Sequence, residues 1–235
     1  MFGEIELPFK HVSERNMVTL KRFSAGVIYK RVSDEEEIKK RVHSSKATVS
    51  LEPVEPFNCP KMVTSHLLIE LTRALVLPPK QSKSIYVKFP VEIGVLVKRS
   101  GKTKVIDVYT DNPPKYALYG DIREGSVCRY YGSDQYLKRP KAEPGTEGVI
   151  NVQVKNATGT WKEISRIVFP GIAMKIYHSE KLVSAKARTR IIDDEKAETR
   201  FIDSPVNKGQ RRSFKMLTAK SYNPLASGFT MEGGY

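Results

Sequence analysis

The chain reads His66-Leu-Leu-Ile-Glu-Leu-Thr-Arg-Ala-Leu-Val-Leu77 before Pro78-Pro79, and this stretch, together with the segments after it, decides the fold. It is long and apolar enough for a helix, but the two prolines end it and a polar turn leads directly into Ile85-Tyr-Val-Lys-Phe89. After Pro90 the chain resumes as Val91-Glu-Ile-Gly-Val-Leu-Val97, and a tight turn leads to Lys104-Val-Ile-Asp-Val-Tyr-Thr110. Strands separated by turns roughly every 8 to 12 residues are typical of an antiparallel β-sandwich.

Segments on both sides of this stretch have the same β-branched and aromatic composition. Further strands are predicted over residues 3–7, 17–23, 26–32, 149–154, 162–169, 173–177, 182–192 and 197–202. We therefore expect an all-β protein, an antiparallel β-sandwich with two immunoglobulin-like lobes.

One short helix is expected near residues 34–42. Ser33 is placed to cap it, Glu36 lies three residues further on, and acidic residues precede basic ones. The segment also offers three ion pairs at helical spacing: Glu35/Lys39, Glu36/Lys40 and Glu37/Arg41.

A linker-like run divides the chain. Arg139-Pro-Lys-Ala-Glu-Pro-Gly-Thr-Glu-Gly148 holds two prolines, two glycines and no apolar residue larger than alanine. The sequence therefore predicts an N-terminal lobe over residues 1–138, which holds a central tyrosine-rich hairpin, and a C-terminal lobe over residues 148–235.

The chain is basic throughout its length. It has 40 Lys and Arg against 26 Asp and Glu in 235 residues, a formal net charge of +14. This balance favours anionic partners such as nucleic acid, an acidic protein surface or an anionic membrane surface. Because the excess is not concentrated in a tail, any basic patch has to be assembled by folding.

Few residues suggest a cofactor, an export signal or a membrane span. Cys59 and Cys128 are the only cysteines and have no metal-ligand spacing, and the four histidines are scattered. The sequence has no phosphate-binding glycine loop, and no apolar run approaches the roughly 18 residues of a spanning helix. We expect a cytoplasmic protein without a cofactor, a metal or a transmembrane segment.

A tyrosine-rich hairpin is predicted between Lys115 and Tyr131, with Arg123-Glu-Gly125 at its turn. Six of the eleven tyrosines lie between Tyr109 and Tyr136. Tyrosine combines a flat ring with a hydroxyl, which suits a recognition or subunit surface, but it is also an ordinary strand residue, and alternation would bury about half of the cluster. The expected partner surface consists of Tyr116, Tyr119, Arg123, Arg129, Tyr130 and Tyr131.

Part of this region resembles a known family. The segments Pro90-Val-Glu-Ile-Gly-Val, Asp107-Val-Tyr, Lys115-Tyr-Ala-Leu-Tyr-Gly and Cys128-Arg-Tyr are similar to an uncharacterised archaeal family, a domain of unknown function, over about Pro90 to Tyr131. The resemblance implies an archaeal, intracellular protein and brings no activity, substrate or site residue with it.

A second candidate surface is the basic stripe Ala185-Lys-Ala-Arg-Thr-Arg190. On a strand, Lys186, Arg188 and Arg190 would share one face at a spacing of about 6.6 Å, close to that of successive phosphates. The alternative is a solvated strand face neutralised across the hairpin by Glu198 and by the acids of the 193–195 turn.

A third candidate is a pair of carboxylates. Asp107, Asp111, Asp121 and Glu124 flank the tyrosine hairpin, and two carboxylates about 5 to 10 Å apart could hydrolyse a glycosidic bond. Turns also recruit aspartate for backbone hydrogen bonds.

The leading hypothesis from sequence is a non-catalytic binding or assembly protein, which recognises a protein partner or a second copy of itself through the tyrosine hairpin. The alternatives are a nucleic-acid-binding protein that uses the basic stripe and a carbohydrate-active enzyme that uses two of the four carboxylates.

Overall fold

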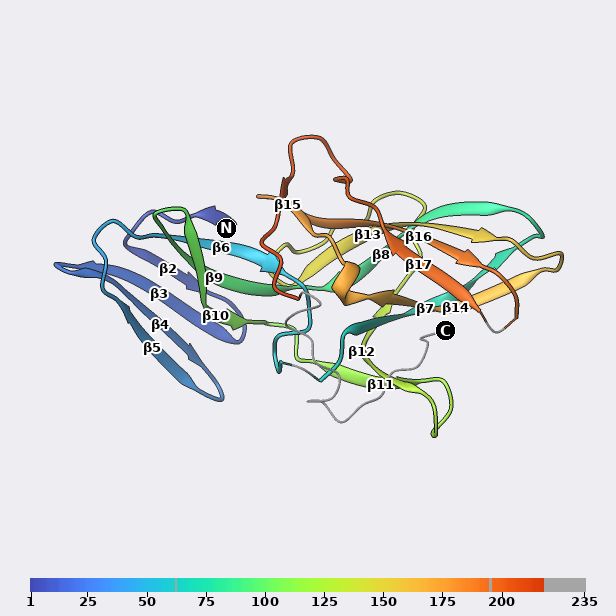
Figure 1. Ribbon diagram of the computed structural model, residues 1–235, viewed down its shortest axis with the longest axis horizontal. Helices are drawn as coiled ribbons and strands as arrows, with labels where there is room; N and C mark the ends of the chain where they lie inside the picture. The colour runs from blue at the N-terminus through green and yellow to red at the C-terminus, as the bar shows by residue number, and fades with distance from the viewer. Residues whose placement is uncertain (62, 195, 218–235) are drawn as a thin grey trace.

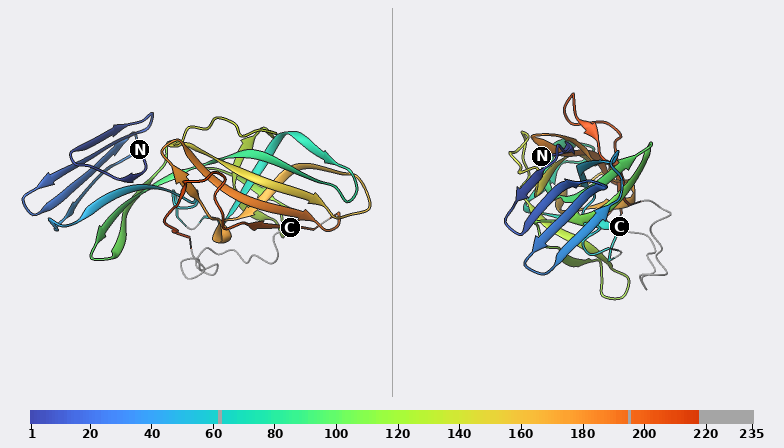
Figure 2. Two further views of the ribbon diagram at one scale, coloured as in Figure 1. Left: turned by 90° about the horizontal axis from the view of Figure 1, so that it is seen from above. Right: turned by 90° about the vertical axis from the view of Figure 1, so that its left-hand side faces the viewer.

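The computed structural model describes residues 1–61, 63–194 and 196–217 (Figure 1). Within these ranges the chain is almost entirely β-structure: its only helical element is the short 3₁₀ turn η1 (Gly171–Ala173). The strands form two β-sandwiches that lie end to end along the long axis of the molecule (Figure 2). The expected all-β sandwich fold is confirmed.

The N-terminal sandwich consists of two four-stranded antiparallel sheets. One contains β2 (Phe9–Val12), β3 (Asn16–Phe23), β4 (Gly26–Ser33) and β5 (Glu37–Val42) in that order. The other has the order β1 (Gly3–Glu4), β6 (Thr48–Val54), β9 (Glu92–Arg99) and β10 (Lys102–Tyr109). Alternate side chains such as Leu20, Tyr29 and Val95 are fully buried between the two sheets and form their core.

The C-terminal sandwich is larger and mixed in strand direction. One sheet has the order β11 (Lys115–Tyr119), β12 (Ser126–Ser133), β7 (His66–Leu77) and β14 (Lys162–Pro170). The other has the order β18 (Arg211–Arg212), β15 (Tyr177–Ser179), β16 (Leu182–Ile191), β13 (Glu147–Asn156) and β8 (Ser82–Pro90), and β17 (Ala197–Phe201) also pairs with β16. The pairs β12–β7 and β13–β16 are parallel, so this sandwich is not purely antiparallel.

The prolines of the 78–90 region mark turning points of the architecture. Pro78-Pro79 ends β7 as predicted, and β8 then ends at Pro90. Because β8 lies in the C-terminal sandwich and β9 in the N-terminal one, the break at Pro90 is where the chain crosses between sandwiches. The chain also crosses between β6 and β7 and between β10 and β11, and we call this junction the waist.

Strands on either side of the 139–148 run pair with one another. Ile150 of β13 is in register with Val87 of β8, and Ile167 of β14 with Ile69 of β7. The core of the C-terminal sandwich accordingly combines residues from before and after the run, which include Ile69, Val87 and Val152. The two sandwiches are therefore not divided at residues 139–148.

The prediction of a helix near residues 34–42 is wrong, because residues 37–42 form strand β5. Ser33 does accept a hydrogen bond from the Glu36 N–H at 3.2 Å, but it stabilises the turn between β4 and β5 instead of a helix start. Helical ion pairs contribute only about 0.2 to 0.5 kcal/mol each. Pairing with β4 gives the backbone groups of β5 their hydrogen bonds and packs Ile38 and Val42 against the core. These gains outweigh the helical ion pairs.

The strand expected over residues 173–177 is also displaced along the chain. Gly171 donates its N–H to the Ser65 carbonyl at 2.7 Å and begins the 3₁₀ turn, which leaves β15 to start at Tyr177. A side chain at position 171 would lie 2.3 Å from the Phe57 ring, so a residue without a Cβ is required for this close approach.

Candidate functional site

The outer face of β16 carries three cations in a row. Lys186, Arg188 and Arg190 alternate with the buried side chains of Ala187 and Thr189, so all three are on the solvent side of the sheet. This alternation arises because one face of the strand packs on the apolar core and the other meets water. The structure thus brings the three residues of the basic stripe together.

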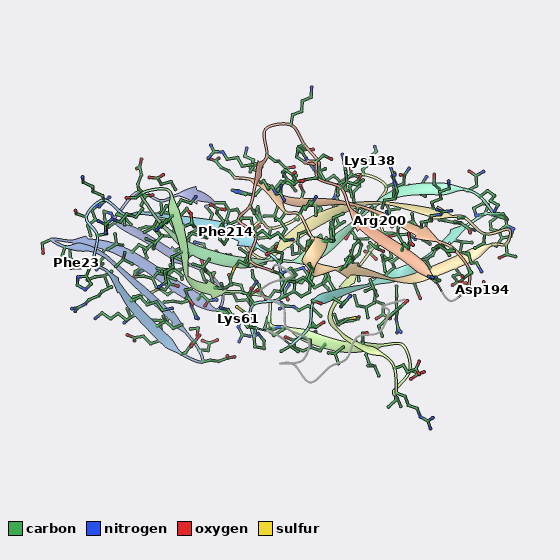
Figure 3. All side chains as sticks on the ribbon, viewed as in Figure 1. Phe23, Lys61, Lys138, Asp194, Arg200 and Phe214 are labelled. Atoms are coloured by element: carbon green, nitrogen blue, oxygen red, sulfur yellow. The ribbon has the colours of Figure 1, made fainter. Side chains whose placement is uncertain are left out.

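Two further cations join this face from neighbouring strands. Arg200 of β17 is in register with Arg188, and Lys155 of β13 is in register with Arg190. Gln153 lies on the other side of Arg188 and accepts a hydrogen bond from its Nε at 3.0 Å. We call the set Lys155, Lys186, Arg188, Arg190 and Arg200 the basic face; Arg200 is labelled in Figure 3.

Only part of the charge on the basic face is neutralised. Glu198 lies opposite Arg190 in register and is 3.3 Å from the Arg200 guanidinium. A hollow of about 240 Å³ is lined by Arg188, Arg190, Glu198 and Arg200. Asp194 of the neighbouring turn pairs with Lys162 instead. Among the described residues, Lys155, Lys186 and Arg190 form no ion pair, because Glu198, although opposite Arg190, pairs with Arg200.

Sequence reasoning missed Arg200 and Lys155. Each stands alone among residues of mixed type, so no local pattern separates it from any other exposed cation. Only the register of β13, β16 and β17 places both beside the stripe.

The tyrosine hairpin forms as β11 and β12, and its rings are divided between the two faces of the sheet. Tyr116 and Tyr131 lie on the face that also carries Arg129, where Tyr131 packs against the core, and Tyr119 and Tyr130 lie on the opposite face. The Tyr131 hydroxyl donates to Glu147 at 2.6 Å, and the Tyr130 hydroxyl donates to Glu70 at 2.8 Å. The hydrogen bond to Glu70 raises the pKa of Tyr130, and that from Tyr130 lowers the pKa of Glu70.

Arg129 is buried at the waist and does not contribute to a surface. It is 1% exposed, and its Nη1 lies 2.8 Å from a carboxylate oxygen of Glu92, which is 0% exposed. Glu92 also accepts the backbone N–H groups of Asn58 and Cys59 at 2.8 and 3.3 Å. Burial raises the pKa of Glu92, and the Arg129 guanidinium opposes that rise.

The Arg129–Glu92 pair joins the two sandwiches, because Glu92 opens β9 and Arg129 lies on β12. The Arg129 Nη2 donates to the Asn112 carbonyl at 3.1 Å, which fixes the segment between β10 and β11. The Arg129–Glu92 pair therefore holds together the three segments that cross between the sandwiches at the waist. Sequence reasoning could not foresee this, because an arginine in a strand ordinarily faces water.

What the hairpin does expose is an apolar arm. Tyr116 and Leu118 on β11 are 38% and 42% exposed, and Ile122 at the turn is 93% exposed. Among the described residues β11 is also the edge strand of its sheet, with β12 as its one neighbour. Arg123 is exposed at the same turn, and Tyr119 is half-buried and lines the groove between β14 and β17.

The carboxylates near the hairpin are held by structural contacts. Asp107 accepts the Tyr29 hydroxyl at 2.5 Å and the Arg31 Nε at 2.7 Å. Asp111 accepts the Ser13 hydroxyl and the Asn16 amide. Asp121 accepts the N–H groups of residues 123 and 124, and these bonds lower its pKa.

Within residues 1–61, 63–194 and 196–217, no group of three or more His, Cys, Asp or Glu side chains is arranged to hold a metal ion. The same residues include no helix with the length and apolar character to cross a membrane.

Together these observations define an elongated double β-sandwich protein with a buried ionic waist and a basic sheet face. The chain belongs to the family described as "Protein of unknown function (DUF432)", which it matches over residues 1–232. The family thus extends well beyond the Pro90 to Tyr131 region in which the resemblance was found. Comparison with curated proteins and with solved structures found no match.

Proposed function

We propose that this chain is a non-catalytic binding protein for single-stranded nucleic acid and that the basic face is its binding surface. The observation that carries the proposal is five cations on three adjacent strands with one carboxylate, Glu198, among them. Cations on alternate residues lie about 6.6 Å apart along a strand, which suits the backbone of an extended single strand.

The polar neighbours of the cations support nucleic acid as the ligand. Asn151 is in register with Lys186, and Tyr86 of β8 is in register with Asn151, so an amide and a tyrosine continue the same row. Arginine guanidinium planes can also stack on unpaired bases. With few groups placed to read base edges, we expect affinity to depend on the phosphate backbone and to vary little with base sequence.

An anionic membrane surface fits the basic face less well. Peripheral membrane binding usually combines cations with apolar side chains that enter the lipid. The large exposed apolar side chains of the described residues are Val12, Val76, Tyr116, Leu118, Ile122, Leu137 and Trp161, and none of them belongs to β13, β16 or β17. We place the binding activity in the cytoplasm, since Cys59 and Cys128 are both free thiols.

The experiment compares the affinity of a labelled single-stranded oligonucleotide for the native chain and for the triple variant Lys186→Ala, Arg188→Ala, Arg190→Ala. A matched control removes three exposed lysines from the N-terminal sandwich: Lys21→Ala, Lys39→Ala and Lys102→Ala. The proposal predicts loss of binding in the first variant and near-native binding in the control. Equal losses in both variants would mean that only net charge matters, and no binding at low salt would exclude the proposal.

A second candidate function is self-association through the apolar arm, because Leu118 is 42% exposed on a strand that lies at the edge of its sheet among the described residues, and Ile122 in the turn that follows is 93% exposed. Antiparallel pairing of two β11 strands around Leu118 would set Lys115 of one copy beside the Asp121 end of the other, so their charges are complementary. Sedimentation equilibrium tests this function: the native chain should dimerise, and Leu118→Asp should be a monomer. A native monomer at all concentrations would exclude it.

A further inference from the structure

A large cavity lies at the waist on the open side of the N-terminal sandwich. It has a volume of about 940 Å³ and lies between the edge strands β5 and β10. The loops at residues 58–61 and 113–114 close its end toward the C-terminal sandwich, and Figure 3 shows Lys61 in the first of them. This volume is within the range of small-molecule sites, roughly 300 to 1,000 Å³.

The uncompensated charge in this cavity is positive. Its three carboxylates are all paired with its two arginines: Glu35 with Arg15 at 3.1 Å, and Glu36 and Asp107 with Arg31 at 2.6 and 2.7 Å. The cavity is also lined by Lys40 and Lys61, which have no carboxylate partner among the described residues. Lys40 donates to the Ile106 carbonyl and thereby lies against β10. An anionic group would therefore be favoured beside these two lysines.

The cavity wall formed by β10 offers an unpaired donor and an unpaired acceptor. Tyr109 is 2% exposed, and its hydroxyl has no hydrogen-bond partner among the described residues. Asp107 lies on the same face of β10 and binds Tyr29 and Arg31 through Oδ2, while its Oδ1 has no hydrogen-bond partner among the described residues. A buried hydroxyl without a partner is costly, by about 1 to 3 kcal/mol.

Tyr109 acts as a donor over the whole ordinary pH range, because burial raises its pKa. A ligand hydroxyl is the group that meets both needs, since it can accept from Tyr109 and donate to Asp107. The remaining walls include Ile38, Pro60 and Pro113, which are suited to the carbon skeleton of a ligand.

We propose that this cavity binds a sugar phosphate, with its hydroxyl groups toward Tyr109 and Asp107 and its phosphate beside Lys40 and Lys61. The site is separate from the basic face, which lies on the other sandwich, and the proposal does not depend on nucleic-acid binding.

Calorimetric titration of the full chain with ribose 5-phosphate tests the proposal, with inorganic phosphate and ribose as separate probes of the two ends. Saturable binding of ribose 5-phosphate is expected, at least about tenfold tighter than either part alone. Tyr109→Phe should weaken it by about fivefold or more without lowering thermal stability, and should even raise stability slightly, because the hydroxyl that is removed is buried with no partner among the described residues of the free protein.

Lys61→Ala should weaken binding to a similar degree, and the control Lys21→Ala, on the same sandwich but outside the cavity, should not. The proposal would be overturned if inorganic phosphate bound as tightly as ribose 5-phosphate and if Tyr109→Phe bound ribose 5-phosphate as tightly as the native chain. The site would then be an adventitious ion only, held by lysines. Absence of saturable heat for all three probes would overturn it as well. If Tyr109→Phe proves unstable, the contrast between the two lysine variants decides.

Discussion

Replacement of Arg129 by methionine should destabilise the protein strongly and more at high pH than at low pH. The side chain is 1% exposed and its loss leaves the Glu92 carboxylate buried without its counter-ion. Removing one partner of a buried ion pair costs about 3 to 5 kcal/mol. That is a large part of the roughly 5 to 15 kcal/mol by which most domains are stable.

The pH dependence arises from Glu92. Burial already raises the folded-state pKa of Glu92, and loss of the opposing guanidinium raises it further. As pH rises above the ordinary glutamate value of about 4.3, the unfolded chain releases its proton before the folded one does, so stability falls until the folded pKa is passed. Each unit of added shift costs about 1.4 kcal/mol above that point.

The assay is urea unfolding followed by circular dichroism at about pH 5 and about pH 8, and the predicted fall in stability should be seen between these two values. Arg166→Met is the matched control, because its pair with Glu70 at 2.9 Å is solvent-exposed and should be worth less than about 1 kcal/mol. Adding Glu92→Gln to Arg129→Met should remove the pH dependence and recover part of the loss. A loss below about 1 kcal/mol that is equal at both pH values would refute the account of the waist.

Two further predictions concern the cores and the thiols. Gly148→Ala should lower the melting temperature markedly, because a Cβ there would lie 2.4 Å from the Phe89 ring, whereas Gly159→Ala, with open space around it, should have little effect. Burial raises the pKa of Cys128 to about 11 and raises that of Cys59 as well, so neither thiol should react quickly with a disulfide reagent near neutral pH until the chain is unfolded in urea.

The fold class could be predicted from the sequence because the residues that end strands and form turns act locally. Pro78-Pro79 ends β7 in the structure as expected, and β16 alternates between buried and more exposed side chains over residues 185–191, so the basic stripe could be placed on one face in advance. The 34–42 segment failed because capping and helical ion pairs are weak local preferences, and pairing with β4 is a tertiary interaction that the segment itself does not encode.

The sites were predicted less well, because they depend on register between distant strands. Arg129 and Glu92 are 37 residues apart, and nothing near either one indicates that they meet. The parallel pairing of β13 with β16, which sets Lys155 beside Arg190, joins two strands that are not consecutive in sequence. The waist cavity combines residues from both sheets of one sandwich and from two loops, so it too could be seen only in the folded chain.

The salt dependence of single-stranded nucleic-acid binding tests the central claim most directly. Five phosphate contacts on the basic face predict a slope of log affinity against log salt of about −3.5, a loss of about a hundredfold between roughly 50 and 200 mM salt. The variant lacking Lys186, Arg188 and Arg190 should show a slope of about −1.4, and the variant lacking Lys21, Lys39 and Lys102 should keep the native slope. A native slope near zero, or one that the basic-face substitutions leave unchanged, would contradict the account.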